Sequence, residues 1–286
     1  MVLGVALSLL SAVLFGGMAI SLGFAVRRSR DAEMGAFVTT FGGFLVCAAV
    51  AAVGREWGGD LVPFVLAGLL APGGSQLLFV LAVRESGPAR ASVIAGAAPL
   101  VAVTIAIIAL DEPVRPALLV GAVLIVAGGL ALVAERVRPD SFRPIGLVFA
   151  FGCTIFFATR DNIVRRLASD TDVAPQLAAA ATILSGSALI LVYLVATRRG
   201  GLVRDLRRAG LPFVLPGLLW GGSYASLFEA FYRERVSVVS PLVATESLFS
   251  VLLAVLLLRR TELVGRHLVL GALLIVGGGA LIGAFR

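Results

Sequence analysis

The chain of 286 residues is strongly apolar: 59% of its residues are hydrophobic, 14% are charged, and the mean hydropathy is +1.03. This composition excludes a soluble globular domain, which needs more polar surface to stay in solution. The formal net charge is +7, and every basic residue is an arginine. The arginines lie in short segments between apolar blocks rather than on one basic face, which excludes nucleic-acid binding.

Ten apolar blocks follow one another along the chain. A helix rises about 1.5 Å per residue, so roughly 20 residues cross a hydrocarbon core of about 30 Å. Backbone polar groups in lipid must be satisfied within the segment, so each block is expected to be a helix. The first block is too long for a cleaved signal peptide and is expected to be retained. The sequence predicts an all-α, polytopic membrane protein with ten transmembrane helices at residues 2–26, 34–53, 61–83, 89–110, 116–134, 144–164, 175–196, 211–232, 236–258 and 268–285.

The two halves of the chain repeat each other. LVGAVLIVAGG at 119–129 matches VLGALLIVGGG at 269–279, and LAPGGSQLLFVLAVRE at 70–85 parallels LWGGSYASLFEAFYRE at 219–234. Each repeat holds five helices, and an odd number makes the second copy enter the membrane in the opposite orientation. We therefore expect two inverted five-helix repeats, at residues 1–134 and 144–286.

Four segments carry a resemblance to a known family. In the first half they are AVRESGPARASVIAGAAPL and LDEPVRPALLVGAVLIVAGG, and in the second YRERVSVVSPLVATESLF and RRTELVGRHLVLGALLIVGGG. With five plus five helices, the chain resembles the drug/metabolite transporter superfamily, in particular its EamA-type members. The resemblance implies a central cavity lined mainly by helices 1, 3, 4, 6, 8 and 9, with helices 5 and 10 at the periphery. The family usually has Glu-Pro in the ninth helix, whereas this chain has Glu246-Ser247.

Interruptions by glycine and proline at matching places in two helices point to the binding site of a transporter. Helices 3 and 8 carry such residues at matching positions, and their polar and aromatic neighbours are candidate substrate ligands. The alternative is that the glycines only allow tight helix packing. The expected helix-break residues are Pro72, Gly73, Gly74, Gly221 and Gly222, with Pro99 in helix 4, and the expected ligands are Gln76, Trp220, Ser223 and Tyr224.

Three further residues lie within predicted helices. Pro99 and Glu246 fall at mid-membrane in helices 4 and 9. An acidic side chain at that depth is costly, so Glu246 is expected to face protein or water and to couple transport to protons or bind a substrate amine. A structural glutamate is the alternative. Arg160 is a candidate substrate contact, or else the neutralising partner of Asp161.

These features favour a secondary transporter that moves a small metabolite by alternating access, and the resemblance suggests export of amino acids or related compounds. The chain lacks G-x-x-x-x-G-K-[ST], so we expect no ATP hydrolysis. An intramembrane enzyme acting on lipid and a non-transporting membrane scaffold are the rival classes. We expect no enzyme activity, no cofactor and no metal site. The expected partners are a small-molecule substrate and the lipid bilayer of the cell membrane, and the Gly279-x-x-x-Gly283 spacing leaves a homodimer open.

Arginine placement predicts the orientation of the chain. Sixteen arginines lie in the loops that follow odd-numbered helices, and seven lie in the even-numbered loops and at the C-terminus. Positive residues in short loops stay cytoplasmic, so we expect both termini outside, although relatives more often have them inside. A reporter that is active only in the cytoplasm, fused after Arg286, should therefore be silent. An active reporter at that position would contradict the orientation.

Overall fold

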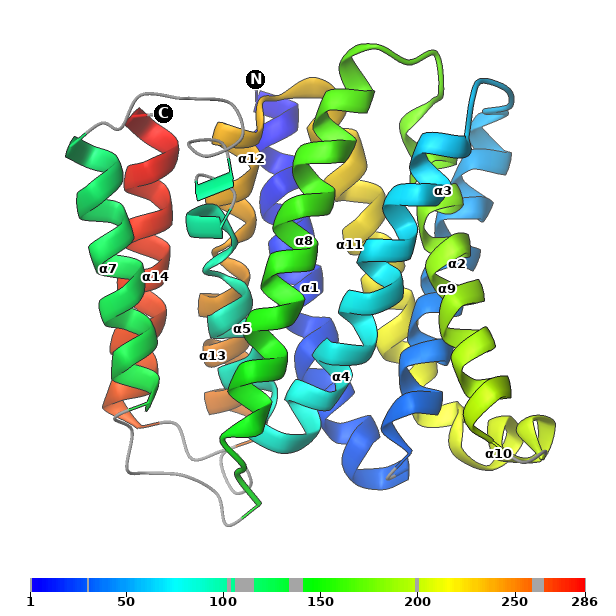
Figure 1. Cartoon of the computed structure of the whole chain (residues 1–286), viewed down its shortest axis with the longest axis horizontal. Coiled ribbons are helices and arrows are strands. Elements are labelled where there is room, and N and C mark those ends of the chain that lie inside the picture. The colour runs from blue at the N-terminus through cyan, green and yellow to red at the C-terminus, as the bar shows by residue number, and fades with distance from the viewer. Residues whose placement is uncertain are drawn as a thin grey trace.

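The computed structural model describes residues 2–29, 31–101, 104–105, 116–133, 141–198, 201–258 and 265–285. Within these ranges every regular element is a helix. The long helices run antiparallel between two edges of the molecule, and both ends of the chain lie at the same edge (Figure 1). This edge is called the terminal edge below, and the other is called the arginine-rich edge.

The first half contains three long apolar helices and two shorter ones. Their elements are α1 (Val2–Ser29), α2 (Ala32–Gly54), α3 (Val62–Gly68), η1 (Leu69–Gly74), α4 (Ser75–Ser86), α5 (Pro88–Ala95) and α7 (Pro116–Val133). The predicted helix at 89–110 extends beyond the described residues.

The second half begins at the edge opposite to the start of α1, because α8 rises from the arginine-rich edge (Figure 1). Its elements are α8 (Ile145–Ser169), α9 (Pro175–Thr197), α10 (Leu202–Ala209), η2 (Leu211–Phe213), α11 (Val214–Arg233), α12 (Val236–Val243), α13 (Glu246–Leu257) and α14 (Arg266–Phe285).

Seven helices among the described residues are long and apolar enough to cross a membrane. They are Val2–Ser29, Ala32–Gly54, Val62–Ser86, Ile145–Ser169, Pro175–Thr197, Leu211–Arg233 and Val238–Leu257. Three shorter apolar helices accompany them, at Pro88–Val101, Leu119–Leu132 and Arg266–Ile282.

The third crossing is interrupted where the sequence predicts it. Ala71 has an extended backbone (φ −142°, ψ 118°) between α3 and α4. Pro72 has no N–H and its ring clashes with the preceding turn, so it does not continue a regular helix. This interruption packs against α9: a Cβ built on Gly186 would lie 2.6 Å from the Cγ of Pro72.

The predicted fourth and ninth helices are also interrupted, one in each half of the chain. α5 ends at Ala95 and α12 ends at Val243, and each is followed by a two-residue turn before the helix resumes. The two turns face each other, because a Cβ on Gly96 would lie 3.2 Å from the carbonyl oxygen of Ala244. The matched interruption between the halves therefore lies here.

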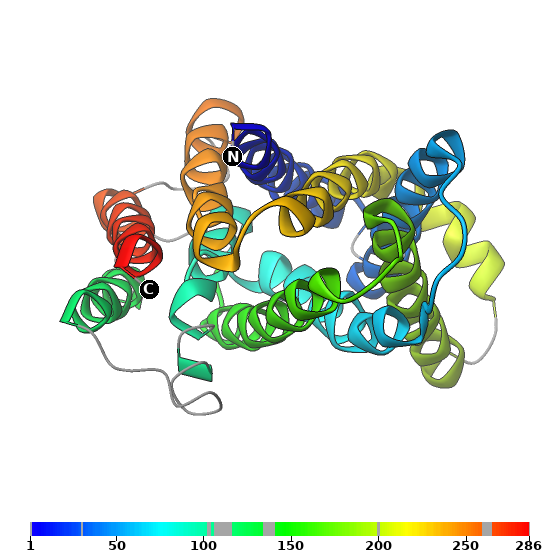
Figure 2. The ribbon, with the colours of Figure 1, turned by 90° about the horizontal axis from the view of Figure 1, so that it is seen from above.

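The helices α7 and α14 form a closely packed pair at one end of the bundle (Figures 1 and 2). Their glycines face one another: a Cβ on Gly128 would lie 2.8 Å from the Gly271 carbonyl oxygen, and a Cβ on Gly278 would lie 2.6 Å from that of Gly121. Small residues let two backbones approach closely in a membrane. These four glycines are thus used for packing within one chain.

The segment between the seventh and eighth predicted helices was expected to be a charged loop, but it contains the short helix α10. Leu202, Leu206 and Ala209 recur with helical spacing, while the other positions hold three arginines, Val203 and Asp205. α10 lies across the arginine-rich edge instead of crossing the molecule (Figure 1).

An ion-pair cluster ties α9 to the start of α2 at this edge. Arg198 lies 2.6 Å from Asp31, 3.3 Å from Glu33 and 3.4 Å from Asp205. Asp31 also caps α2, because its side chain accepts a hydrogen bond from the Met34 N–H. Partial burial raises the pKa of Asp31, but the hydrogen bonds from Arg198 and Met34 outweigh it, so the pKa lies below its ordinary value of 3.8.

We predict that Asp31→Asn lowers the stability of the detergent-purified protein by about 1 kcal/mol at neutral pH, because asparagine still caps the helix but does not pair with Arg198. A depressed pKa adds stability above pH 3.8 that is lost as the pH falls through the folded-state value. The difference from wild type in thermal unfolding should therefore shrink on acidification.

Asp60→Asn is the matched control, because Asp60 accepts a backbone hydrogen bond from Val62 in an exposed loop. It should change stability little at any pH. Equal losses in the two variants would show that the Arg198 cluster does not stabilise this edge.

Candidate functional site

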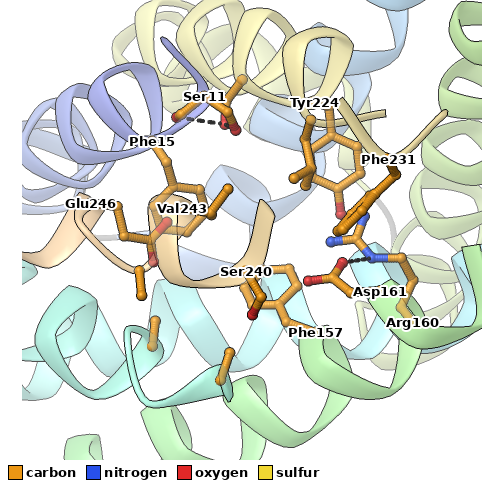
Figure 3. Close-up of a pocket in the computed structure, with 15 residues that line it drawn as sticks. Ser11, Phe15, Phe157, Arg160, Asp161, Tyr224, Phe231, Ser240, Val243 and Glu246 are labelled. Atoms are coloured by element: carbon orange, nitrogen blue, oxygen red, sulfur yellow. Dashed lines mark hydrogen bonds and ion pairs between the residues drawn. The ribbon is translucent and has the colours of Figure 1, made fainter. Parts of the chain in front are cut away.

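A pocket lies between the two halves, with about 550 Å³ of space between atoms, a figure that includes its opening to solvent. Its walls come from α1, α5 and residue Ala98 in the first half, and from α8, α11, α12 and α13 in the second. Four aromatic and three serine side chains contribute to the lining along with three charged ones, as Figure 3 shows in part. The aromatic lining residues are Phe15, Phe157, Tyr224 and Phe231. Phe228 is not a lining residue, but its ring also contacts Arg160.

One wall carries an ion pair. Arg160 and Asp161, adjacent on α8, have their Nε and Oδ1 atoms 2.8 Å apart. The Arg160 guanidinium lies 4.7 Å from the ring centroid of Tyr224 and 5.6 Å from that of Phe157. Arg160 is only 2% exposed, and its Nη1 has no hydrogen-bond partner among the described residues. The aromatic faces and the carboxylate together stabilise this buried cation.

The opposite wall carries one carboxyl group. Glu246 is the first residue of α13, directly after the turn that follows α12. It lies across the pocket from the Arg160–Asp161 pair (Figure 3). Glu246 is 5% exposed, and its carboxyl group has no ion pair or hydrogen bond within the described part of the chain. A carboxyl group in this position is available to a ligand that enters the pocket.

Two serines join α1 and α11 at the pocket. The Ser223 hydroxyl donates to the Ser11 carbonyl oxygen at 3.0 Å, and the two hydroxyl oxygens lie 2.9 Å apart. Ser240 on α12 is a third lining serine, on a different wall (Figure 3). These hydroxyl groups supply short-range hydrogen bonding without adding charge.

The structure brings four of the sequence-predicted site residues to this one pocket: Arg160, Ser223, Tyr224 and Glu246. Gln76 and Trp220 are fully buried and are not lining residues. The ring centroid of Trp220 lies 4.6 Å from that of Tyr224, so Trp220 supports the lining from behind. The amide atoms of Gln76 have no hydrogen-bond partner among the described residues.

The expected break in the eighth crossing does not occur, because α11 runs as one helix through Gly221 and Gly222. A Cβ on Gly221 would lie 2.6 Å from the Val46 Cβ on α2, and a Cβ on Gly222 would lie 3.2 Å from Leu14 on α1. Both glycines therefore allow neighbouring helices to approach while the helical hydrogen bonds of α11 are kept.

The other helix-break residues also pack against helices. A Cβ on Gly73 would lie 2.8 Å from Leu189 of α9, and one on Gly74 would lie 3.1 Å from the ring of Phe156. Pro99 lies beside Gly279 of α14, since a Cβ on that glycine would meet the proline ring at 3.3 Å. None of these residues lines the pocket.

Several lining residues were not anticipated, among them Ser11, Phe15 and Ser240. The first two lie in an apolar helix in which no charge or proline distinguishes one face from another. Ser240 directly precedes Pro241, and this proline inside the predicted helix at 236–258 was the signal that could have located this region.

Comparison with known proteins places the chain in a family. A family model described as the EamA-like transporter family matches residues 2–134 and 144–284. One solved structure, described only as the crystal structure of a protein, is 21% identical with a TM-score of 0.66, and the match covers 97% of this chain and 94% of that one. At that identity the likeness shows the fold alone. No curated protein matches the chain significantly.

The family model covers nearly the whole chain in two stretches that correspond to the two halves. The chain therefore belongs to the EamA-like transporter family and is a multi-pass membrane transporter of small molecules.

Proposed function

We propose that the chain is a secondary transporter of a small zwitterionic metabolite, such as an amino acid, which it moves by alternating access and by exchange with protons. The observation that carries the proposal is the pocket of Figure 3, in which the Arg160–Asp161 pair and Glu246 lie on opposite walls. Family membership supplies the transport of small molecules, and the pocket supplies the chemistry of the substrate.

The architecture that supports this proposal is one of ten crossings in two inverted five-helix repeats, residues 1–134 and 144–286. The seven long apolar helices and three shorter ones add up to this number. The opposite directions of α1 and α8 support the inversion (Figure 1). The repeats would lie in the cell membrane with the arginine-rich edge in the cytoplasm.

A zwitterion matches the charges of the pocket. A substrate carboxylate would accept hydrogen bonds from the unpartnered Nη1 of Arg160, and the two groups suit each other in charge and geometry. A substrate ammonium group would pair with Glu246 on the other wall. The rings of Phe15 and Phe157 form an apolar surface for the substrate side chain, with 6.1 Å between their centroids.

Coupling of substrate transport to protons would follow because Glu246 has no ion pair or hydrogen bond among the described residues. Burial disfavours the charged form of a carboxyl group, and a nearby cation favours it. Binding of the substrate ammonium would therefore release a proton from Glu246, and substrate release would allow reprotonation. Exchange of a substrate for a proton needs no nucleotide and uses the ion gradient.

The rival functions have less support. An intramembrane enzyme acting on lipid would need a nucleophile with a base, or a metal. The pocket lining contains neither cysteine nor histidine, and the described residues contain no cluster of three metal-ligating side chains. A non-transporting scaffold would gain nothing from an unpaired buried carboxyl group, which costs stability.

We predict that Glu246→Gln abolishes accumulation driven by a pH gradient while substrate exchange at equal pH persists with a weaker affinity, because glutamine keeps the shape of the site and accepts a hydrogen bond from the ammonium group but neither carries a charge nor titrates. A counterflow screen of amino acids with wild-type protein in proteoliposomes identifies the substrate first. Accumulation by Glu246→Gln should then fall to the level of empty liposomes.

The matched control is Glu229→Gln, since Glu229 also lies in a membrane-spanning helix but pairs with Arg233 away from the pocket. This variant should accumulate substrate like wild type. Unchanged pH dependence in Glu246→Gln would contradict coupling through this residue, and failure of every zwitterion to exchange would contradict the substrate class.

A further inference from the structure

We propose that a second pocket, at the arginine-rich edge, binds the headgroup of an anionic phospholipid. This pocket is separate from the proposed transport site and has about 1110 Å³ of space between atoms, a figure that includes its opening to solvent. It lies where the end of α1 meets α10, η2 and the start of α11. Its polar lining includes Arg28, Arg207 and Arg208, and its apolar lining includes Phe24, Leu211 and Leu215.

The three arginines have no acidic partner in the part of the chain that the structure describes. The acidic groups of this corner are Asp31, Glu33 and Asp205, and all three contact Arg198 instead, at 2.6, 3.3 and 3.4 Å. These three carboxylates thus pair with Arg198, which is outside the pocket lining, and none of them pairs with a pocket arginine. The pocket is left with three guanidinium groups, whose mutual repulsion an anion would relieve.

The level of the pocket in the membrane favours a lipid. α10 lies across the arginine-rich edge (Figure 1), and the pocket lies where α1 ends and α11 begins. These positions correspond to the headgroup region of a bilayer that the helices span. Basic pockets between helices at this level are a recognised way of binding anionic headgroups.

The apolar wall distinguishes a lipid from a soluble anion. Phe24, Leu211 and Leu215 are 48%, 79% and 57% exposed beside the arginines. A phospholipid would satisfy both surfaces, with its phosphate on the guanidinium groups and its acyl chains against the apolar side chains. A free phosphate would leave this wall uncovered.

A serine hydroxyl adds a hydrogen-bond donor of the right kind. The Ser29 Oγ lines the pocket, is covered by protein, and has no hydrogen-bond partner among the described residues. Phosphate oxygens accept hydrogen bonds from hydroxyl and guanidinium groups alike. A phosphodiester placed between Arg28 and the α10 arginines would give this hydroxyl its partner.

Native mass spectrometry of the detergent-purified full chain, titrated with dioleoyl phosphatidylglycerol, tests the proposal. Wild type should bind one lipid with clear preference over dioleoyl phosphatidylcholine. The double variant Arg207→Gln/Arg208→Gln should weaken that binding by about tenfold or more, since each arginine near a lipid surface contributes about 1 kcal/mol. Arg207→Lys/Arg208→Lys keeps the charge and should retain most of the binding.

The matched control is Arg204→Gln/Arg166→Gln, which removes two exposed arginines that do not line the pocket, one of them on α10 itself. It should bind phosphatidylglycerol like wild type. Equal losses in control and pocket variants, or no loss in the pocket variant, would overturn the site.

Competition identifies the occupant. Glycerol 3-phosphate and inorganic phosphate carry the anionic group without acyl chains, so neither should displace the lipid at millimolar concentration. Displacement by either would overturn the assignment to a phospholipid. Thermal unfolding of each variant confirms that it is folded before its binding is compared.

Discussion

A charged or ionisable side chain at the centre of a bilayer costs about 3 kcal/mol or more unless it is paired or hydrated. Arg160, Asp161 and Glu246 are such groups inside the bundle, and the packing of the surrounding helices keeps them out of lipid. Arg160 and Asp161 pair with each other and are covered by aromatic rings, while Glu246 faces the same interior space. These polar groups thus line a pocket inside the bundle and stay away from the apolar surface that faces the membrane.

Close helix packing is what encloses these groups. Gly221 and Gly222 bring α11 against α2 and α1, and the Ser11–Ser223 bond joins α1 to α11 at the pocket wall. In the fourth and ninth crossings the helices are interrupted instead, and the two turns meet at Gly96 and Ala244. Glu246 begins the helix segment after one of these turns. The interruptions therefore place the ionisable group at the interface of the two halves, where movement of one half against the other would change its surroundings.

The charged side chains at the arginine-rich edge are divided between two places. At the arginine-rich edge Arg198 collects three acidic groups, which leaves a basic pocket beside α10. Sequence alone indicates the excess of arginine but not this division, because the partners come from α2, α9 and α10 and meet only in the folded chain. The central pocket and the basic pocket both use α1 and α11, but they use different stretches of these helices.

The helical architecture and the family could be predicted from residue patterns, because long apolar blocks and a two-fold repeat have few alternative explanations. The position of Glu246 was also predictable, since a lone carboxyl group in an apolar block stands out. The direction in which each side chain points could not be predicted from the sequence. Gln76 and Ser223 occupy matching interruptions in the sequence, yet Gln76 is buried in the bundle and Ser223 lines the pocket. The glycines of α11 were predicted to interrupt the helix, but glycine serves both close packing and helix interruption. Only the neighbouring helix in the folded chain shows which of the two applies.

The account depends most directly on a water-accessible pocket between the halves, which thiol labelling measures. In a background with Cys47 and Cys153 replaced by alanine, single cysteines at Ser223, Ser240 and Gln76 are treated with a small water-soluble maleimide in proteoliposomes. The first two positions line the pocket and should react, with protection by the transported substrate, whereas Gln76→Cys should remain unlabelled. Labelling at Gln76→Cys, with Ser223→Cys and Ser240→Cys inert in every condition, would contradict the account.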